Sequence, residues 1–132
     1  MSNRTRGTGP VPVMVLIVAW IIPGAGQGWL GQRGKALAFF LLITGTLVAG
    51  WLLGGLTNVT TESLWYFAQL GAAGPTLILT PINKFVASGG LPPQGTVYDI
   101  GTLYTAVAGL LNILVMMDAY VRATQKGGEK QE

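Results

Sequence analysis

Residues 36–54 read ALAFFLLITGTLVAGWLLG, a run without a single charged side chain. A second run, IGTLYTAVAGLLNILVMMDAYV at residues 100–121, holds one charged residue, Asp118. A helix needs about 20 mostly apolar residues to cross the hydrocarbon core of a bilayer. Both runs meet that length, and no segment alternates as the strands of a membrane barrel do. The sequence therefore predicts an all-α integral membrane protein.

The composition supports this class and excludes several kinds of catalytic and metal-binding chemistry. Charged residues make up 10% of the 132-residue chain, against about 25% in a soluble domain. The chain has no Cys and no His, so it offers no disulfide, thiolate nucleophile, imidazole base or imidazole metal ligand. It shows no nucleophile–base set, paired carboxylates or phosphate-binding loop. We expect no enzyme, no metal site and no cofactor of its own, while a lipid or pigment bound through a complex stays open.

Two further apolar blocks are interrupted. Residues 11–30 contain Pro23-Gly24-Ala25-Gly26-Gln27-Gly28, and residues 64–82 contain Gly74-Pro75. Proline and closely spaced glycines destabilise a helix, so we expect residues 23–28 to depart from regular α-helix. The first block also resembles the apolar region of a signal peptide, and we interpret it as a retained membrane helix.

The whole chain, 1–132, is therefore predicted to be one membrane domain with about four apolar helices. The first is broken or kinked at Pro23–Gly28, and polar tails lie at 1–10 and 123–132. The block at 11–30 either crosses or turns back as a half-helix. We expect it to cross, because its length suffices.

Basic residues orient membrane helices, since Lys and Arg favour the cytoplasmic side. Four spans with a cytoplasmic N-terminus divide the eight basic residues five to three in the favoured direction. A first block that turns back gives the same division, with the C-terminus outside. The net charge of +3 thus reflects helix anchoring, and no nucleic-acid partner is expected.

The interrupted block carries a family resemblance. The pattern Pro23-Gly24-x-Gly26-x-x-x-Leu30-Gly31-x-Arg33, followed by an apolar helix, is similar to a motif in small bacterial multi-pass membrane proteins of unknown function. It is related in pattern to the two-transmembrane-helix domain family, and residues 110–120 resemble that family's Asp-bearing final helix. Residues 55–98 depart from the two-helix pattern. The resemblance implies a helical membrane fold in a bacterial inner membrane. It does not indicate any particular activity.

Ionisable and amide side chains within the apolar blocks are the first candidate sites. Asp118 lies four residues before Arg122, a spacing at which the two can form a charge pair on one helix face. Asn112 lies deeper in the same block, where an amide usually hydrogen-bonds to a neighbouring helix. Each residue also has an alternative, functional role. Asp118 would contact an ion, a proton or a partner, and Asn112 would be a ligand to an ion or a pigment.

Small residues and interface residues complete the candidate set. The pairs Gly24/Gly28 and Gly50/Gly54 are predicted to let helices pack closely. Five residues at block ends are expected to contact lipid or a partner: Arg33, Lys35, Trp29, Trp51 and Trp65. Trp51 and Trp65 flank the polar loop 55–62, so we expect them at the same membrane interface.

Three functions remain open. The small size and poor polar inventory favour a non-catalytic accessory or scaffolding subunit, packed through its helices in a larger membrane complex such as a respiratory or photosynthetic one. A small transporter or channel is the second hypothesis, with its site at the helix breaks. Its polar residues would be Asp118, Asn112, Thr76 and Thr80. A lipid-binding envelope protein that uses Arg33 and Lys35 is the third.

Overall fold

The computed structural model describes residues 11–56, 58, 65–89 and 95–129, and these residues form helices and turns with no strand. The predicted all-α class is confirmed. The elements are α1 (Pro12–Ile21), α2 (Ala25–Trp29), α3 (Arg33–Leu53), α4 (Trp65–Gln69), the 3-10 turn η1 (Leu70–Ala72), α5 (Ala73–Ala87) and α6 (Thr96–Glu129).

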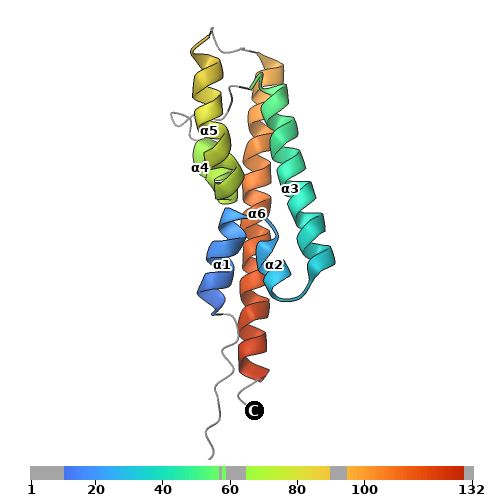
Figure 1. The fold of residues 1–132 in the computed structure, drawn as a ribbon. Coiled ribbons are helices and arrows are strands. Elements are labelled where there is room, and N and C mark those ends of the chain that lie inside the picture. Colours follow the sequence, from blue (N-terminus) through green and yellow to red (C-terminus); the bar gives the residue numbers. More distant parts are fainter. Residues whose placement is uncertain (1–10, 57, 59–64, 90–94, 130–132) are drawn as a thin grey trace, which may run out of the picture.

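Two long helices lie side by side and form the frame of the molecule (Figure 1). Helix α6 has 34 residues, or about 51 Å, and α3 has 21 residues, or about 32 Å. Both are long and apolar enough to cross a membrane. They approach closely at glycines: a Cβ atom on Gly101 would lie 2.6 Å from the carbonyl oxygen of Gly50. Any larger side chain there would push the two helices apart.

The first apolar block turns back on itself. Helix α1 has 10 residues, or about 15 Å, which is half of the roughly 30 Å hydrocarbon core. It ends where Ile22 is extended, Pro23 lacks an N–H donor, and Gly24 takes a φ of +80°. Helix α2 then runs back toward the end of the molecule where α1 begins (Figure 1).

The contacts that α1 and α2 make with α6 show this reversal. Helix α1 follows α6 from the buried cluster of Val15 with Ala119 to Ala19, whose carbonyl is bound by Asn112. Past the turn, α2 descends along the same stretch of α6, and Lys126 Nζ donates to Leu30 O at 2.7 Å. The departure from regular helix expected at 23–28 thus falls at 22–24, and residues 25–29 are helical again.

The third block also reverses. Helix α4 and η1 run inward, and α5 returns alongside them, with Tyr66 Oη 3.4 Å from Thr80 Oγ1. The hydroxyl of Thr76 donates to Gln69 O at 2.7 Å and closes the turn. Pro75 is tolerated because it lies in the first turn of α5, where N–H groups have no intrahelical acceptor. The expected four spans are therefore not observed: two of the four blocks are long helices, and two are folded pairs of short ones.

Helix ends differ from the sequence boundaries in two places. Helix α5 continues through Pro81 to Ala87, so residues 83–87 are not a loop. Helix α6 continues to Glu129, so much of the expected tail 123–132 is helical. Tertiary contacts explain the second difference, because Ala123 is buried and Lys126 binds the end of α2. The tail at 1–10 lies outside the described residues.

Asn58 joins the last turn of α3 to the last residue of α4. Asn58 Nδ2 donates to Gly50 O at 3.1 Å, and Asn58 O accepts from Gln69 Nε2 at 3.3 Å. These bonds bring Trp51 of α3 and Trp65 of α4 into the same half of the molecule. Of the loop at 55–62 that the tryptophans flank, residues 57 and 59–62 lie outside the described residues.

The close approach of α4 to α6 yields a stability prediction. A Cβ on Gly109 would overlap the carbonyl oxygen of Ala68, so Gly109→Ala should cost about 1–3 kcal/mol through overpacking. Gly45→Ala is the matched control: nothing lies within 4 Å of its added Cβ, and alanine gains up to about 1 kcal/mol in a helix. Thermal unfolding in mild detergent should show a lower Tm for Gly109→Ala alone. Equal Tm values for the two variants would contradict the packing.

Candidate functional site

Asn112 joins the two reversed blocks at the centre of the molecule. Its side chain is fully buried, and Nδ2 donates to Ala19 O at 3.1 Å and to Gly71 O at 2.8 Å. The first carbonyl belongs to the last turn of α1, and the second belongs to η1. One amide on α6 therefore binds the inner tips of both folded blocks.

The hydrogen bonds at this junction pair backbone carbonyls that helices of half length would otherwise leave without a donor. The last four carbonyls of a helix have no intrahelical partner, and a buried polar group without a hydrogen bond costs about 1–3 kcal/mol. Besides Asn112, Trp20 Nε1 donates to Leu70 O at 2.7 Å across the junction. The tips touch directly, since a Cβ on Gly74 would overlap Ile21 O. We name this contact region of α1, η1, α5 and α6 the tip junction.

Other buried amides continue a polar line along α6. Gln27 Nε2 donates to Val115 O at 2.8 Å, and Gln69 Nε2 donates to Thr105 Oγ1 at 2.6 Å. Together with Asn58 and Asn112, these residues bury four side-chain amides whose oxygens have no hydrogen-bond partner in the described chain. Amides accept hydrogen bonds and do not ionise. This line can hold a water molecule or a polar group, but its amides cannot relay a proton.

The sequence analysis identified Asn112 and missed three of these amides. Gln27, Asn58 and Gln69 lie inside or beside apolar blocks, as Asn112 does, so the same criterion would have found them. Gln27 lies within the interrupted segment at 23–28, and Asn58 lies within the polar loop predicted at 55–62.

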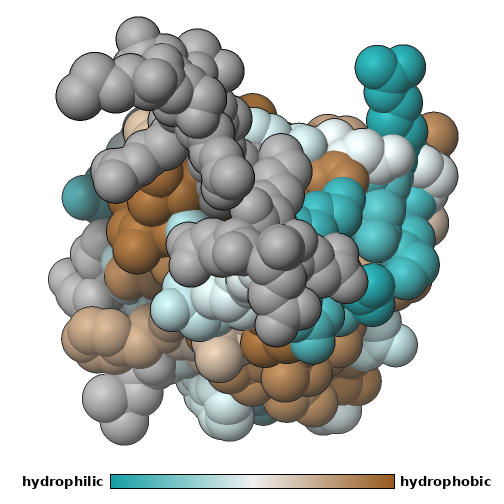
Figure 2. All heavy atoms as spheres, turned by 90° about the horizontal axis from the view of Figure 1, so that it is seen from below, coloured by the Kyte–Doolittle hydropathy of each residue, from teal (hydrophilic) through white to brown (hydrophobic). Residues whose placement is uncertain are grey.

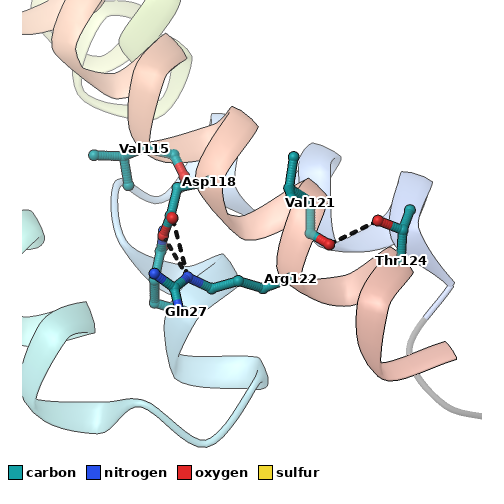
Figure 3. Close-up of polar contacts among 6 residues, drawn as sticks. All are labelled: Gln27, Val115, Asp118, Val121, Arg122 and Thr124. Carbon is teal, nitrogen blue, oxygen red and sulfur yellow. Dashed lines mark hydrogen bonds and ion pairs between the residues drawn. The ribbon is translucent and has the colours of Figure 1, made fainter. Parts of the chain in front are cut away.

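Asp118 and Arg122 form an ion pair one turn apart on α6 (Figure 3). Arg122 Nε lies 3.0 Å from Oδ1 and 2.9 Å from Oδ2, and Gln27 Nε2 donates to Oδ2 at 3.4 Å. The side chains of Asp118 and Arg122 are 40% and 36% exposed, so the pair adds about 0–1 kcal/mol to stability. Asp118 does not lie in an enclosed polar cavity.

The small residues expected at helix contacts all face other parts of the chain. Gly24 and Gly28 pack on Ala36 of α3, and Gly50 packs on Gly101 and Tyr104 of α6. Gly54 packs on Asn58. These glycines lie at contacts inside the molecule.

The residues expected to contact lipid or a partner lie at helix ends. Trp29, Arg33 and Lys35 are exposed around the turn between α2 and α3. Trp65 is exposed at the start of α4, and Trp51 is half-buried near the end of α3. Arg33 and Lys35 share the first turn of α3, near Trp29, whereas Trp51 and Trp65 lie toward the other end of the molecule (Figure 1).

An apolar groove lies between α3 and α5, beside the tip of α1. Its volume is about 360 Å³. It is lined by Ile21, Ile22, Pro23, Phe40, Thr44, Leu47, Val48, Gly74, Pro75, Ile78 and Leu79. A second hollow of about 320 Å³ adjoins it and is lined by Ile22, Pro23, Gly24, Ala25, Gly28, Arg33, Ala36, Leu37 and Phe40. Almost all of this surface is apolar, so the groove is not a polar pathway.

A family model matches residues 14–131, which cover nearly the whole described chain. The chain belongs to the family of unknown function DUF6677. The match confirms the expected membership of a family of unknown function, and it does not confirm the resemblance to the two-transmembrane-helix family. No curated protein and no solved structure matches this DUF6677 chain.

The tip junction of this DUF6677 protein depends on one amide. Asn112→Leu keeps the volume but leaves Ala19 O and Gly71 O without their donor, so it should destabilise the fold by about 1–2 kcal/mol. Thr46→Val is the control, because the Thr46 hydroxyl bonds only Leu42 O of its own helix. Thermal unfolding in detergent checks both variants. An unchanged Tm for Asn112→Leu would show that the amide does not hold the tips.

Proposed function

We propose that the chain is a non-catalytic accessory or scaffolding subunit of a larger membrane complex in a bacterial inner membrane. In this proposal α3 and α6 cross the bilayer, and the reversed blocks enter it from opposite sides to about half its depth. The lengths of α3 and α6 support the crossings, and the length of α1 supports the half-depth entry.

The distribution of basic residues supports this topology. The turn before α3 and the last turns of α6 lie at one end of the molecule, and the last turn of α5 lies at the other (Figure 1). Among the described residues, Arg33, Lys35, Arg122 and Lys126 belong to the first end, and Lys84 belongs to the second. Four of these five described basic residues thus lie at the first end. This asymmetry supports a cytoplasmic location for that end.

Viewed onto this basic end, polar side chains cluster on one part of the face, and apolar side chains form much of its border (Figure 2). Such a border suits a molecule whose sides meet lipid or other helices and whose end meets water.

The outward face of α3 is the observation that carries the subunit proposal. Only 17% of its most apolar 18-residue window is buried within the chain, against 50% for α6. The exposed residues recur at helical spacing as Ala38, Leu42, Gly45, Ala49 and Leu52. Membrane helices associate through close van der Waals packing, which small residues permit. This stripe therefore fits a helix of another subunit.

The internal use of polar groups favours a subunit over a transporter. Asn112 and Thr76 bind backbone carbonyls, and Asp118 is paired with Arg122. The hydrogen-bond donors of Asn112 and Thr76 and the charge of Asp118 are thereby used within the chain, and the groove between α3 and α5 is apolar.

The α3 face can be tested in the native membrane. Wild-type protein extracted in mild detergent should migrate within a larger assembly. Gly45→Leu fills the α3 stripe and should lower the assembled fraction by about tenfold, equal to about 1.4 kcal/mol. Its Tm should stay unchanged, because nothing in the chain lies within 4 Å of that position. Blue native electrophoresis measures the assembled fraction.

Gly127→Leu is the matched control, since it adds the same side chain at an open position near the end of α6. It should leave assembly intact. Migration of the wild type as a lone monomer, together with ion or solute flux in liposomes that Asp118→Asn abolishes, would contradict the subunit proposal and favour a transporter.

A further inference from the structure

The apolar groove and the hollow beside it form one continuous surface. They share Ile22, Pro23 and Phe40 as walls. The groove continues to Val48 on α3, and the hollow reaches Arg33 at the start of the same helix. From Arg33 to Val48 is 15 residues, or about 22 Å along the helix axis. The surface thus runs from the basic end of the molecule to the depth of the tip junction.

The two reversed blocks create this surface. Because α1 stops at Ile21 and α5 starts at Ala73, no full-length helix covers the flank of α3 between them. The tips of both blocks instead form the inner wall, with Pro23 from the first and Pro75 from the second.

The size of the groove indicates a narrow occupant. A helix is at least about 10 Å wide, so 360 Å³ would hold only about 5 Å of it, less than one turn. A lipid acyl chain is a single file of methylenes. The surface is also about as long as one leaflet is deep, roughly 15 Å of hydrocarbon plus the head-group region. An acyl chain fits this groove better than a helix does.

The basic end indicates the charge of that occupant. Arg33 lines the hollow, is exposed, and has no hydrogen-bond or ion-pair partner among the described residues. It opens α3, whose first turn contains no acidic residue and has no side-chain cap. The N-terminal N–H groups of α3 and the helix dipole therefore favour an anion at the same place.

We propose that this surface binds one anionic phospholipid of the leaflet at the Arg33 end. One acyl chain lies in the groove between α3 and α5, and the phosphate group lies beside Arg33 at the start of α3. This site goes beyond the subunit role, and it rests on the proposed crossing of the bilayer by α3.

Native mass spectrometry of the purified full chain tests the proposal. The protein is exchanged into detergent that contains equal amounts of phosphatidylglycerol and phosphatidylcholine. The wild type should retain one phosphatidylglycerol in preference to phosphatidylcholine. Arg33→Glu should lower that preference about tenfold or more, since each basic side chain contributes about a factor of five. Lys84→Glu, the same reversal at the other end, should not change it.

A second pair of variants distinguishes binding of an acyl chain in the groove from binding of the lipid by charge alone. Ile78→Trp places a large ring at the wall of the groove and should abolish retention of the lipid. Leu77→Trp, at a comparably exposed neighbour outside the groove, should not. Circular dichroism and elution volume report whether each variant folds. Equal retention of the two lipids by the wild type, unchanged retention by Ile78→Trp, or a co-purified polypeptide seated there in place of lipid would overturn the proposal.

Discussion

Backbone carbonyls left open at the inner ends of two short helices set the central constraint on this fold. In an apolar surrounding each such group must find a donor inside the protein. Asn112 supplies two hydrogen bonds at once, to Ala19 O and Gly71 O, and the Trp20 indole supplies another. The glycines at the tips then allow backbone-to-backbone contact that larger side chains would prevent. The reversed blocks can therefore end at the centre of α6 without leaving these carbonyls unpaired.

The other main features follow from that junction. Because both blocks turn back, the basic residues at the start of α3 and at the end of α6 lie at one end of the molecule (Figure 1). Because neither block covers α3 completely, an apolar groove remains on its flank and an apolar stripe on its outer face. The ion pair of Asp118 and Arg122 lies outside the junction, is partly exposed, and adds little to its stability.

The long helices and the role of Asn112 in helix contact could be predicted from the sequence, and the reversals could not. Uncharged runs of sufficient length identify α3 and α6 directly. The segment Pro23–Gly28 indicated a break, but a kink and a full reversal have the same local signature. Gly24 at φ +80° and the contacts of Gln27 and Leu30 with α6 decide between them, and these contacts join residues about 90 positions apart in the sequence. Charge counting did not distinguish a crossing first block from a reversed one, because both arrangements divide the eight basic residues five to three.

The topology of the first block is the most direct test of this account. The chain has no native cysteine, so single cysteines can be placed at three exposed positions, Gly34, Ser88 and Thr124. Labelling of intact spheroplasts and of inverted vesicles with a membrane-impermeant maleimide reports the side of each. The account predicts that Gly34→Cys and Thr124→Cys react from the cytoplasmic side and Ser88→Cys from the opposite side. If Gly34→Cys reacts from the same side as Ser88→Cys, the first block crosses the membrane and the tip junction does not exist as described.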